Sequence, residues 1–188
     1  QPPEGTPANI STNPTTATLI CRRTRAARRV AHRNRNRNRA RSLHPMDNPS
    51  TPHYAVQWAN EALHLLPEHA LWWPAAHTLF IADLHLGKAA SYRQLGQPVP
   101  AGSTQDNLQR LSQLIARHAA RHLVCLGDFL HAASGRTPRV LQALRTWRDQ
   151  HPALCITLVR GNHDSHAGDP PPALGIEVVN EPWLIGPF

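Results

Sequence analysis

Three short apolar runs in this chain each lead into a cluster of Asp, Asn and His residues. The runs are residues 79–82, 123–126 and 154–159, and the clusters are Asp83-Leu84-His85, Gly127-Asp128-Phe129-Leu130-His131 and Gly161-Asn162-His163-Asp164. A short, continuous apolar run is typical of a strand that is buried on both faces. Because ligands bind beyond the carboxyl ends of parallel strands, we expect the three clusters to meet at one site.

The stretches between these runs predict helices. One helix begins at Ser103 or Thr104, either of which can cap it, and ends near Arg121. The next has Thr137-Pro138 at its start, which puts a cap before a proline at the first helical position, and it ends at His151-Pro152. Buried strands that alternate with amphipathic helices predict an α/β fold with a largely parallel sheet.

Residues 54–66 fit two structures. They have the apolar spacing of an amphipathic helix, but residues 62–66 and 70–73, with a Pro-containing turn between them, favour two strands. We expect the strands. Residues 176–179 and 183–185 predict two more strands near the end of the chain.

Positive charge is concentrated in the first 45 residues. They hold ten Arg and one acidic residue, a net charge of +9, whereas residues 46–188 have a net charge of −1. Because the chain starts at Gln1 and its single methionine is Met46, we expect residues 1–45 to be a disordered Arg/Asn-rich leader that need not be native protein. A nucleic-acid-binding arm and a transit peptide are the alternatives. Residues 46–188 are the predicted domain.

Cysteine usage and hydropathy bear on location. Cys125 and Cys155 lie inside apolar runs and are expected to be small buried core residues. The sequence has no disulfide framework, which suits a reducing cytosol, so a cytoplasmic protein is expected. No stretch approaches the roughly 18–20 apolar residues of a membrane helix, so no membrane association is expected.

The first two clusters carry metal-ligand chemistry. Asp83 and His85 lie two residues apart, so both can point to one face of a strand and hold one divalent ion. This pattern alone also fits a strand-end Asp beside a partly exposed His. Asp128 follows Gly127 at a strand end, where a carboxylate can bridge two ions or merely cap a turn. His131, three residues later, can face the same site.

The third cluster is the most specific. Asn162 offers a neutral carbonyl oxygen to a metal, and His163 can donate a proton, with its ring oriented by a partner such as Asp164. An Asx turn is the structural alternative. Asp83 and Asp128 are 45 residues apart, and Asp128 and Asn162 are 34 apart, which suits one helical crossover each.

Together the clusters predict a site for two divalent ions that hydrolyses a phosphoester. A mixture of Asp, Asn and His ligands suits Mn²⁺, Fe or Zn²⁺ better than Mg²⁺ or Ca²⁺, which prefer oxygen ligands. We expect Mn²⁺, with Fe and Zn²⁺ as alternatives.

The three clusters resemble the first three motifs of the calcineurin-like metallophosphoesterases. Longer matches resemble the bacterial ligase-associated DNA damage response endonucleases, and these are Leu66-Pro67-Glu68, Trp73-Pro74-Ala75, residues 82–90, Gly135-Arg136-Thr137-Pro138, residues 159–164 and His166-Ala167-Gly168-Asp169. The resemblance covers about residues 62–188. It implies a β-sandwich core flanked by helices, and a Mn²⁺-dependent phosphodiesterase or endonuclease that acts on DNA in repair, beside a DNA ligase and a helicase.

The resemblance also implies roles for individual residues. Asp83 and His85 would bind the first metal, Asp128 would bridge both, and Asn162 would bind the second. His163 would act as general acid beside the leaving oxygen.

Further implied roles lie around these ligands. His131 stands where related double-strand-break repair nucleases carry a histidine near the substrate, and Asp164 would assist catalysis. Three cationic side chains would lie near the phosphate or behind the ligands: Lys88, Arg136 and Arg160. For Lys88 and Arg136, a solvated surface charge without such a role is the alternative.

The sequence departs from this family after Asp164. The family has further metal-ligating histidines downstream, the last in a Gly-His-x-His element, whereas this chain has only His166 there. We therefore expect a fragment that lacks its carboxyl-terminal part. Two alternatives to a DNA-processing enzyme stay open: a small-molecule phosphoesterase acting on nucleotides or sugar nucleotides, and an inactive or binding-only fragment.

Overall fold

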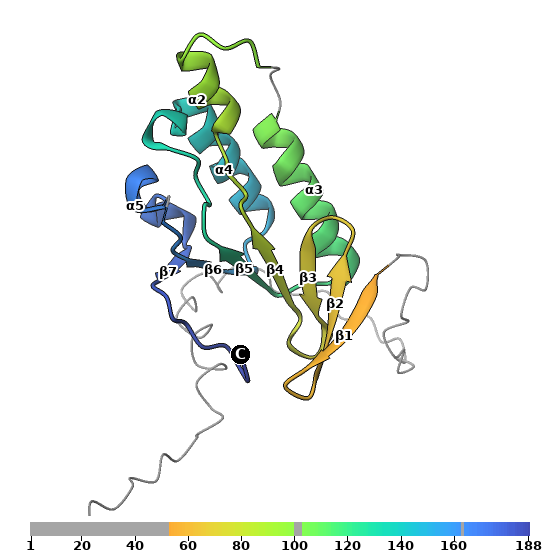
Figure 1. Ribbon diagram of the computed structural model, residues 1–188. Coiled ribbons are helices and arrows are strands. Elements are labelled where there is room, and N and C mark those ends of the chain that lie inside the picture. The colour runs from red at the N-terminus through yellow and green to blue at the C-terminus, as the bar shows by residue number, and fades with distance from the viewer. Residues whose placement is uncertain (1–52, 100–102, 163) are drawn as a thin grey trace, which may run out of the picture. The chain divides into compact units, whose positions relative to one another are not determined.

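The computed structural model describes residues 53–99, 103–162 and 164–188 (Figure 1). Residues 48–184 group into one compact unit, whose described part carries the helices and strands named below. Residues 185–188 belong to the other unit and form a turn, in which Ile185 and Phe188 exchange backbone hydrogen bonds of 2.9 and 3.1 Å. The predicted leader and His163 lie outside the described residues.

Among the described residues, seven strands form one mixed sheet whose spatial order follows the chain. They are β1 (Tyr54–Trp58), β2 (Glu61–Leu66), β3 (Ala70–Trp73), β4 (Thr78–Ala82), β5 (His122–Leu126), β6 (Cys155–Val159) and β7 (Glu177–Val179). Strands β1 to β4 pair antiparallel, whereas β4 to β7 pair parallel. The carboxyl ends of β4, β5 and β6 therefore lie at one edge of the sheet.

Two long helices connect the parallel strands. Helix α3 (Ser103–His118) leads from β4 to β5, and α4 (Pro138–Gln150) leads from β5 to β6. Right-handed crossovers between successive neighbouring strands place both helices on one face, and Figure 1 shows them on the same side of the sheet. At the start of α4, the Val140 backbone N–H donates to Thr137 Oγ1 at 3.3 Å, as the predicted cap requires.

The main hydrophobic core lies between these helices and the sheet. It joins the predicted apolar stripe of α3 to alternate residues of the central strands, including Leu79, Ile81, Leu123, Cys125, Ile156 and Leu158. Side chains alternate between the two faces of a strand, so every second residue reaches the helices. Leu79, Leu123 and Leu158 are 0% exposed. The loops that follow β4, β5 and β6 thus leave from firmly packed strands.

The sequence predicted most of these elements. The strand pair at 62–66 and 70–73, the strands of the three apolar runs and both long helices are confirmed within a few residues. Several short elements were not predicted: β1, α2 (Lys88–Gln94), α5 (Asp164–Ala167), η2 (Pro74–Ala76), η3 (Ala133–Gly135) and η4 (Pro172–Leu174). The strand predicted at 176–179 is β7, but the one at 183–185 is wrong, because these residues pair with no strand of the described chain.

The α/β class is confirmed. Strand β3 pairs with β4, which joins the antiparallel strands edge to edge with the parallel ones. All strands of the described residues therefore belong to one sheet, and the second sheet of the expected sandwich is not among them.

The two cysteines in the apolar runs differ. Cys125 is buried and free, as expected. Burial, and then the charge of Asp164, raise the pKa of the Cys125 thiol to about 12, so it stays protonated. Cys155 is half-buried rather than fully buried, so the expectation of a buried core residue is wrong for it. Within the described residues, no helix is long and apolar enough to cross a membrane.

Candidate metal centre

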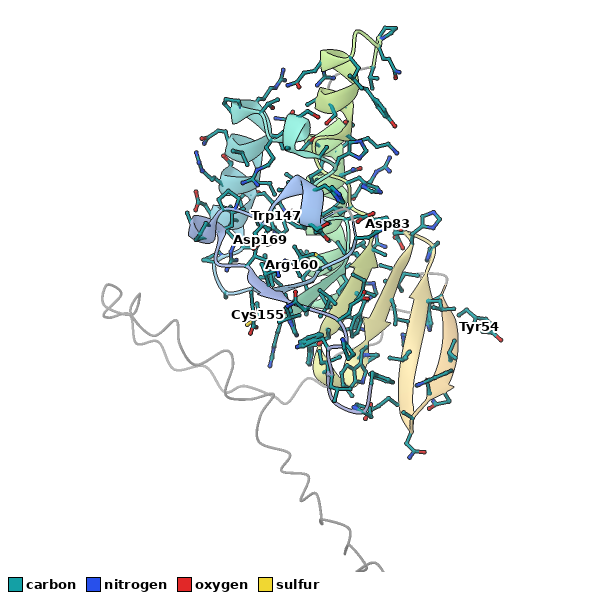
Figure 2. The ribbon with its side chains drawn as sticks, turned by 60° about the vertical axis from the view of Figure 1, so that its left-hand side comes forward. Tyr54, Asp83, Trp147, Cys155, Arg160 and Asp169 are labelled. Carbon is teal, nitrogen blue, oxygen red and sulfur yellow. The ribbon has the colours of Figure 1, made fainter. Side chains whose placement is uncertain are left out.

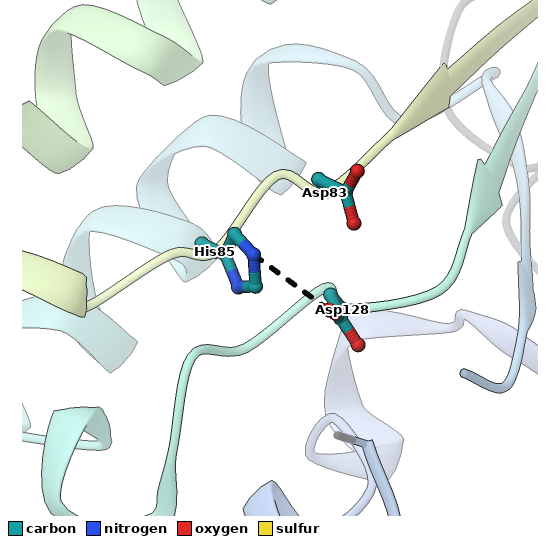
Figure 3. Close-up of side chains that lie close together, drawn as sticks. All are labelled: Asp83, His85 and Asp128. Atoms are coloured by element: carbon teal, nitrogen blue, oxygen red, sulfur yellow. Dashed lines mark ion pairs between the residues drawn. The ribbon is translucent and has the colours of Figure 1, made fainter. Parts of the chain in front are cut away.

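Asp83, His85 and Asp128 meet beyond the carboxyl ends of β4 and β5 (Figure 3). One potential ligand atom from each lies within 4.8 Å of the other two. Asp83 follows β4 directly, and Asp128 follows β5 after one glycine. The first two predicted clusters therefore come together at the expected edge of the sheet.

All three residues have an unusual backbone. Their φ angles are 52° at Asp83, 44° at His85 and 50° at Asp128, in the left-handed region that non-glycine residues rarely adopt. The five other non-glycine residues with positive φ among the described residues lie in turns or at the ends of elements. Such conformations cost free energy and concentrate at functional sites. The turns aim three polar side chains at one point.

Backbone hydrogen bonds hold the two loops together. His85 N–H donates to Asp128 O at 2.8 Å, and Leu86 N–H donates to Phe129 O at 3.0 Å. His131 N–H donates back to Leu86 O at 3.0 Å. These bonds continue the parallel pairing of β4 and β5 past the end of the sheet. They fix the spacing of the side chains that the two loops carry.

Asp128 has the surroundings of a metal ligand. It is 8% exposed, and its Oδ2 lies 3.6 Å from His85 Nε2. Its Oδ1 is buried and has no hydrogen-bond partner within the described part of the chain. A buried carboxylate oxygen without a partner is costly, and a divalent cation would satisfy it. The potential ligand atoms of Asp83, His85 and Asp128 therefore fit a divalent metal ion.

Asp164 supports the loop that carries Asp128 through hydrogen bonds to its backbone. Its Oδ2 accepts hydrogen bonds from the backbone N–H groups of Asp128 (2.7 Å) and Gly161 (2.9 Å), and its Oδ1 accepts one from Phe129 (3.1 Å). The side chain is 2% exposed. Since both oxygens bind backbone, this carboxylate joins the loops after β5 and β6. That geometry gives Asp164 a positioning role.

Two glycines let these loops touch. A Cβ added at Gly161 would lie 3.0 Å from Gly127 Cα and 3.1 Å from Asp128 Oδ1. Gly127 also has a φ of 71°, which favours glycine. The sequence indicated the tight turn at Gly127 but not this contact, since Gly161 lies 34 residues further along.

The known proteins that this chain resembles agree with this geometry. The family model for calcineurin-like phosphoesterases matches residues 76–186, more than half of the chain. The chain belongs to the calcineurin-like phosphoesterase family. It therefore contains a calcineurin-like phosphoesterase domain with a possible metal site, as its motifs predicted.

One protein of known structure that is similar to this phosphoesterase domain is a nuclease. The crystal structure of the nuclease MPE of Pseudomonas putida matches with 44% sequence identity and a TM-score of 0.64. The match covers 72% of this chain, and the chain spans 64% of that nuclease. A comparison with curated proteins gave no significant match.

The third cluster of this phosphoesterase domain is only partly described. Asn162 is exposed on the loop that Asp164 ties to Asp128, and its backbone carbonyl accepts a hydrogen bond from Ser165 Oγ at 2.7 Å. The predicted roles of Asn162 as ligand and His163 as acid stay predictions. His131 is placed at the site, with its ring centroid 5.3 Å from that of His85.

The predicted cations differ in their surroundings. Lys88 is exposed at the start of α2, next to the loop that carries His85. Arg136 Nη1 donates to Ala167 O at 3.1 Å, which ties η3 to the end of α5. The roles predicted for Lys88 and Arg136 near a phosphate stay predictions.

Arg160 is held by other side chains. It binds both carboxylate oxygens of Asp169, at 2.9 and 2.6 Å, and Asn180 Oδ1 at 2.8 Å (Figure 2). The hydrogen bonds from Arg160 hold the pKa of Asp169 below its usual value. These contacts tie the end of β6 to the segment after α5, so the predicted role of Arg160 at phosphate stays a prediction.

Gly161→Ala is expected to disturb the metal centre more than the fold. The new methyl group would press on Asp128 Oδ1, which must move by a few tenths of an ångström. Misplaced ligands or their supports typically cost ~10–100-fold in metal affinity. Calorimetric titration with Mn²⁺ measures this loss. Gly96→Ala is the control for backbone strain away from the centre, because Gly96 has a φ of 79° and a Cβ there meets nothing within 4 Å. Equal Mn²⁺ affinities of both variants would contradict the prediction.

Proposed function

We propose that this chain is the catalytic part of a metal-dependent phosphodiesterase or endonuclease that hydrolyses phosphodiester bonds in DNA. The observation that carries the proposal is the cluster of Asp83, His85 and Asp128 at the sheet edge. The 44% identity to a nuclease supports a nucleic acid as the substrate, and DNA is what the resemblance of the sequence motifs implies.

Two divalent ions are the proposed cofactors, Mn²⁺ in the first place and Fe or Zn²⁺ as alternatives. Asp83 and His85 would hold the first ion, Asp128 would contact both, and Asn162 would contact the second. When bound, such a pair of ions activates water and stabilises the charge that develops on the phosphoryl oxygens.

The chain's own groups have distinct proposed tasks. The loop pairing between His85 and Asp128 orients the ligands, and Asp164 prevents Asp128 from turning away. His163 is the proposed proton donor to the leaving oxygen. His131 and Lys88 would border the scissile phosphate, and the charge of Lys88 would attract it.

The biological setting is proposed from the family resemblance of the sequence. It comprises DNA repair, with a DNA ligase and a helicase as partners, in the cytoplasm, where a bacterium keeps its DNA. The net charge of −1 over residues 46–188 implies that DNA binding by the domain depends on local cations such as Lys88.

The test is hydrolysis by the whole chain, loaded with Mn²⁺, of single-stranded DNA, double-stranded DNA, bis(p-nitrophenyl) phosphate and a sugar nucleotide. We expect cleavage of DNA and of the chromogenic diester, and its loss with EDTA. Asp83→Asn should lower the rate by ~10²–10³-fold, because a metal ligand supports several kcal/mol of transition-state stabilisation. Asp149→Asn, at another exposed aspartate in α4, is the matched control.

Two results would contradict the proposal. Cleavage that survives EDTA would show that the metal site takes no part in the reaction. Equal effects of Asp83→Asn and Asp149→Asn on the rate would show the same. Cleavage of the sugar nucleotide with DNA left intact would identify a small-molecule phosphoesterase instead.

A further inference from the structure

We propose that Tyr92 forms a nucleoside-binding subsite beside the metal centre, where its ring stacks with the base next to the scissile phosphate. The inference rests on the proposed phosphodiesterase function and adds the substrate group that the site would recognise. Tyr92 lies on α2, which the sequence did not predict.

A row of three rings leads from the metal cluster to Tyr92. The His131 ring lies edge-on to His85, with centroids 5.3 Å apart and planes at 79°. The Tyr92 ring also contacts the His131 ring, with centroids 5.7 Å apart and planes at 53°. Since His85 belongs to the cluster, Tyr92 is two ring contacts away from it. A nucleoside whose phosphate lies at the cluster can reach that far.

Helix α2 is firmly held, so Tyr92 is placed before any substrate arrives. Gly87 precedes the helix, and a Cβ there would lie 2.4 Å from Gly135 O, so the two backbones are in direct contact. Ser134 Oγ donates to Ser91 Oγ at 3.0 Å, one residue before Tyr92. A side chain on a rigid support loses less conformational entropy on binding.

The phenol of Tyr92 still has an open polar end. The side chain is half-buried, and its hydroxyl makes no hydrogen bond with any described residue. The hydroxyl oxygen is not buried, so it reaches solvent. A ring with one packed side and an open edge suits contact with a ligand.

Lys88 adds the matching charge. It precedes Tyr92 by one helical turn, so both side chains lie on the same face of α2. Proteins that bind single strands combine cations along the phosphates with aromatic rings under the bases. The pair of Lys88 and Tyr92 has this composition next to the proposed reaction centre. Stacking of this kind tolerates any base, so it would select nucleotides without selecting sequence.

Two chromogenic diesters with the same leaving group test the subsite: thymidine 5′-(p-nitrophenyl) phosphate and methyl p-nitrophenyl phosphate. With Mn²⁺, Tyr92→Ala should lower kcat/KM about tenfold for the thymidine ester, mainly through KM, as expected for a lost stacking contact. The methyl ester has no base, so its kcat/KM should stay within about twofold. Tyr92→Phe should retain most of the preference.

The other tyrosine of the chain is the control. Tyr54 is 71% exposed on β1, and Figure 2 shows it at the outer edge of the sheet, away from Asp83. Tyr54→Ala should leave both esters unchanged. If Tyr92→Ala lowers both esters equally, or neither, the subsite is wrong while the phosphodiesterase function stands.

Failure of the proposed function gives a different result, since the wild-type chain would then hydrolyse neither ester. Calorimetric binding of thymidine 5′-monophosphate and of inorganic phosphate, both with Mn²⁺, then decides about Tyr92. A preference for the nucleotide that Tyr92→Ala removes supports the subsite. Equal affinities of the wild-type chain for both, or a preference that the variant retains, would overturn it.

Discussion

Asp164→Ala is expected to lower the free energy of unfolding by about 3 kcal/mol, because two buried backbone N–H groups and a partly buried one lose their acceptor and a buried group costs ~1–3 kcal/mol when left unsatisfied. Urea unfolding followed by tryptophan fluorescence measures the change. Asp164→Asn should have a smaller effect, since the amide keeps one acceptor but turns a donor toward the other N–H groups.

Asp169→Ala provides the comparison for Asp164. It removes the same side chain from an exposed ion pair with Arg160, and exposed pairs contribute only ~0–1 kcal/mol. Equal destabilisation by the two substitutions would mean that Asp164 does not join the loops. Asp164→Asn should also weaken Mn²⁺ binding, because Asp128 would lose a support of its backbone.

Asp128→Asn is expected to have the opposite pattern: a loss of activity of ~10³-fold or more with little loss of stability. The substitution preserves shape but removes the charge that would contact both metal ions, which costs several kcal/mol in the transition state. The carboxylate it replaces has one buried oxygen without a partner in the described residues, so the metal-free fold loses little.

Two measurements on Asp128→Asn separate these effects. Elemental analysis after dialysis gives the bound Mn²⁺, and urea unfolding in EDTA gives the stability of the metal-free fold. We expect the first to fall strongly and the second to stay within about 1 kcal/mol. If the variant binds Mn²⁺ as tightly as the wild type, Asp128 is not a ligand.

The elements that were predictable from sequence are those with strong local signals. Thr78–Ala82 forms a strand as its apolar run predicts, and α4 begins at the Thr137-Pro138 cap. The meeting of Asp83 with Asp128 was predictable too, because parallel strands put their carboxyl ends at one edge. The short elements of the fold were not predictable. Helix α2 has only seven residues and no side-chain cap, so no local sequence pattern predicts it.

The roles of charged residues were the hardest to predict. Asp164 was predicted to orient a catalytic ring, and that role stays a prediction, but the hydrogen bonds from its oxygens to backbone groups of residues 128, 129 and 161 were not foreseen. Arg160 was predicted to lie near phosphate, which also stays a prediction, but its hydrogen bonds to Asp169 and Asn180 were not foreseen. Both outcomes depend on contacts between distant loops, which sequence spacing does not reveal. The strand predicted at 183–185 failed for a related reason, since a strand needs a partner as well as apolar residues.

The sheet order has a consequence for how the centre assembles. Because β4, β5 and β6 are neighbours both in space and along the chain, each new strand adds to an edge that is already made. Each parallel pairing still has to close a long crossover, as between Thr78 and His122, and pairing of this kind is slow. During synthesis, β4 and β5 can pair before β6 has left the ribosome. Asp164, 36 residues after Asp128, then arrives last. Its carboxylate then binds backbone N–H groups of both loops and fixes the positions of the metal-ligating side chains.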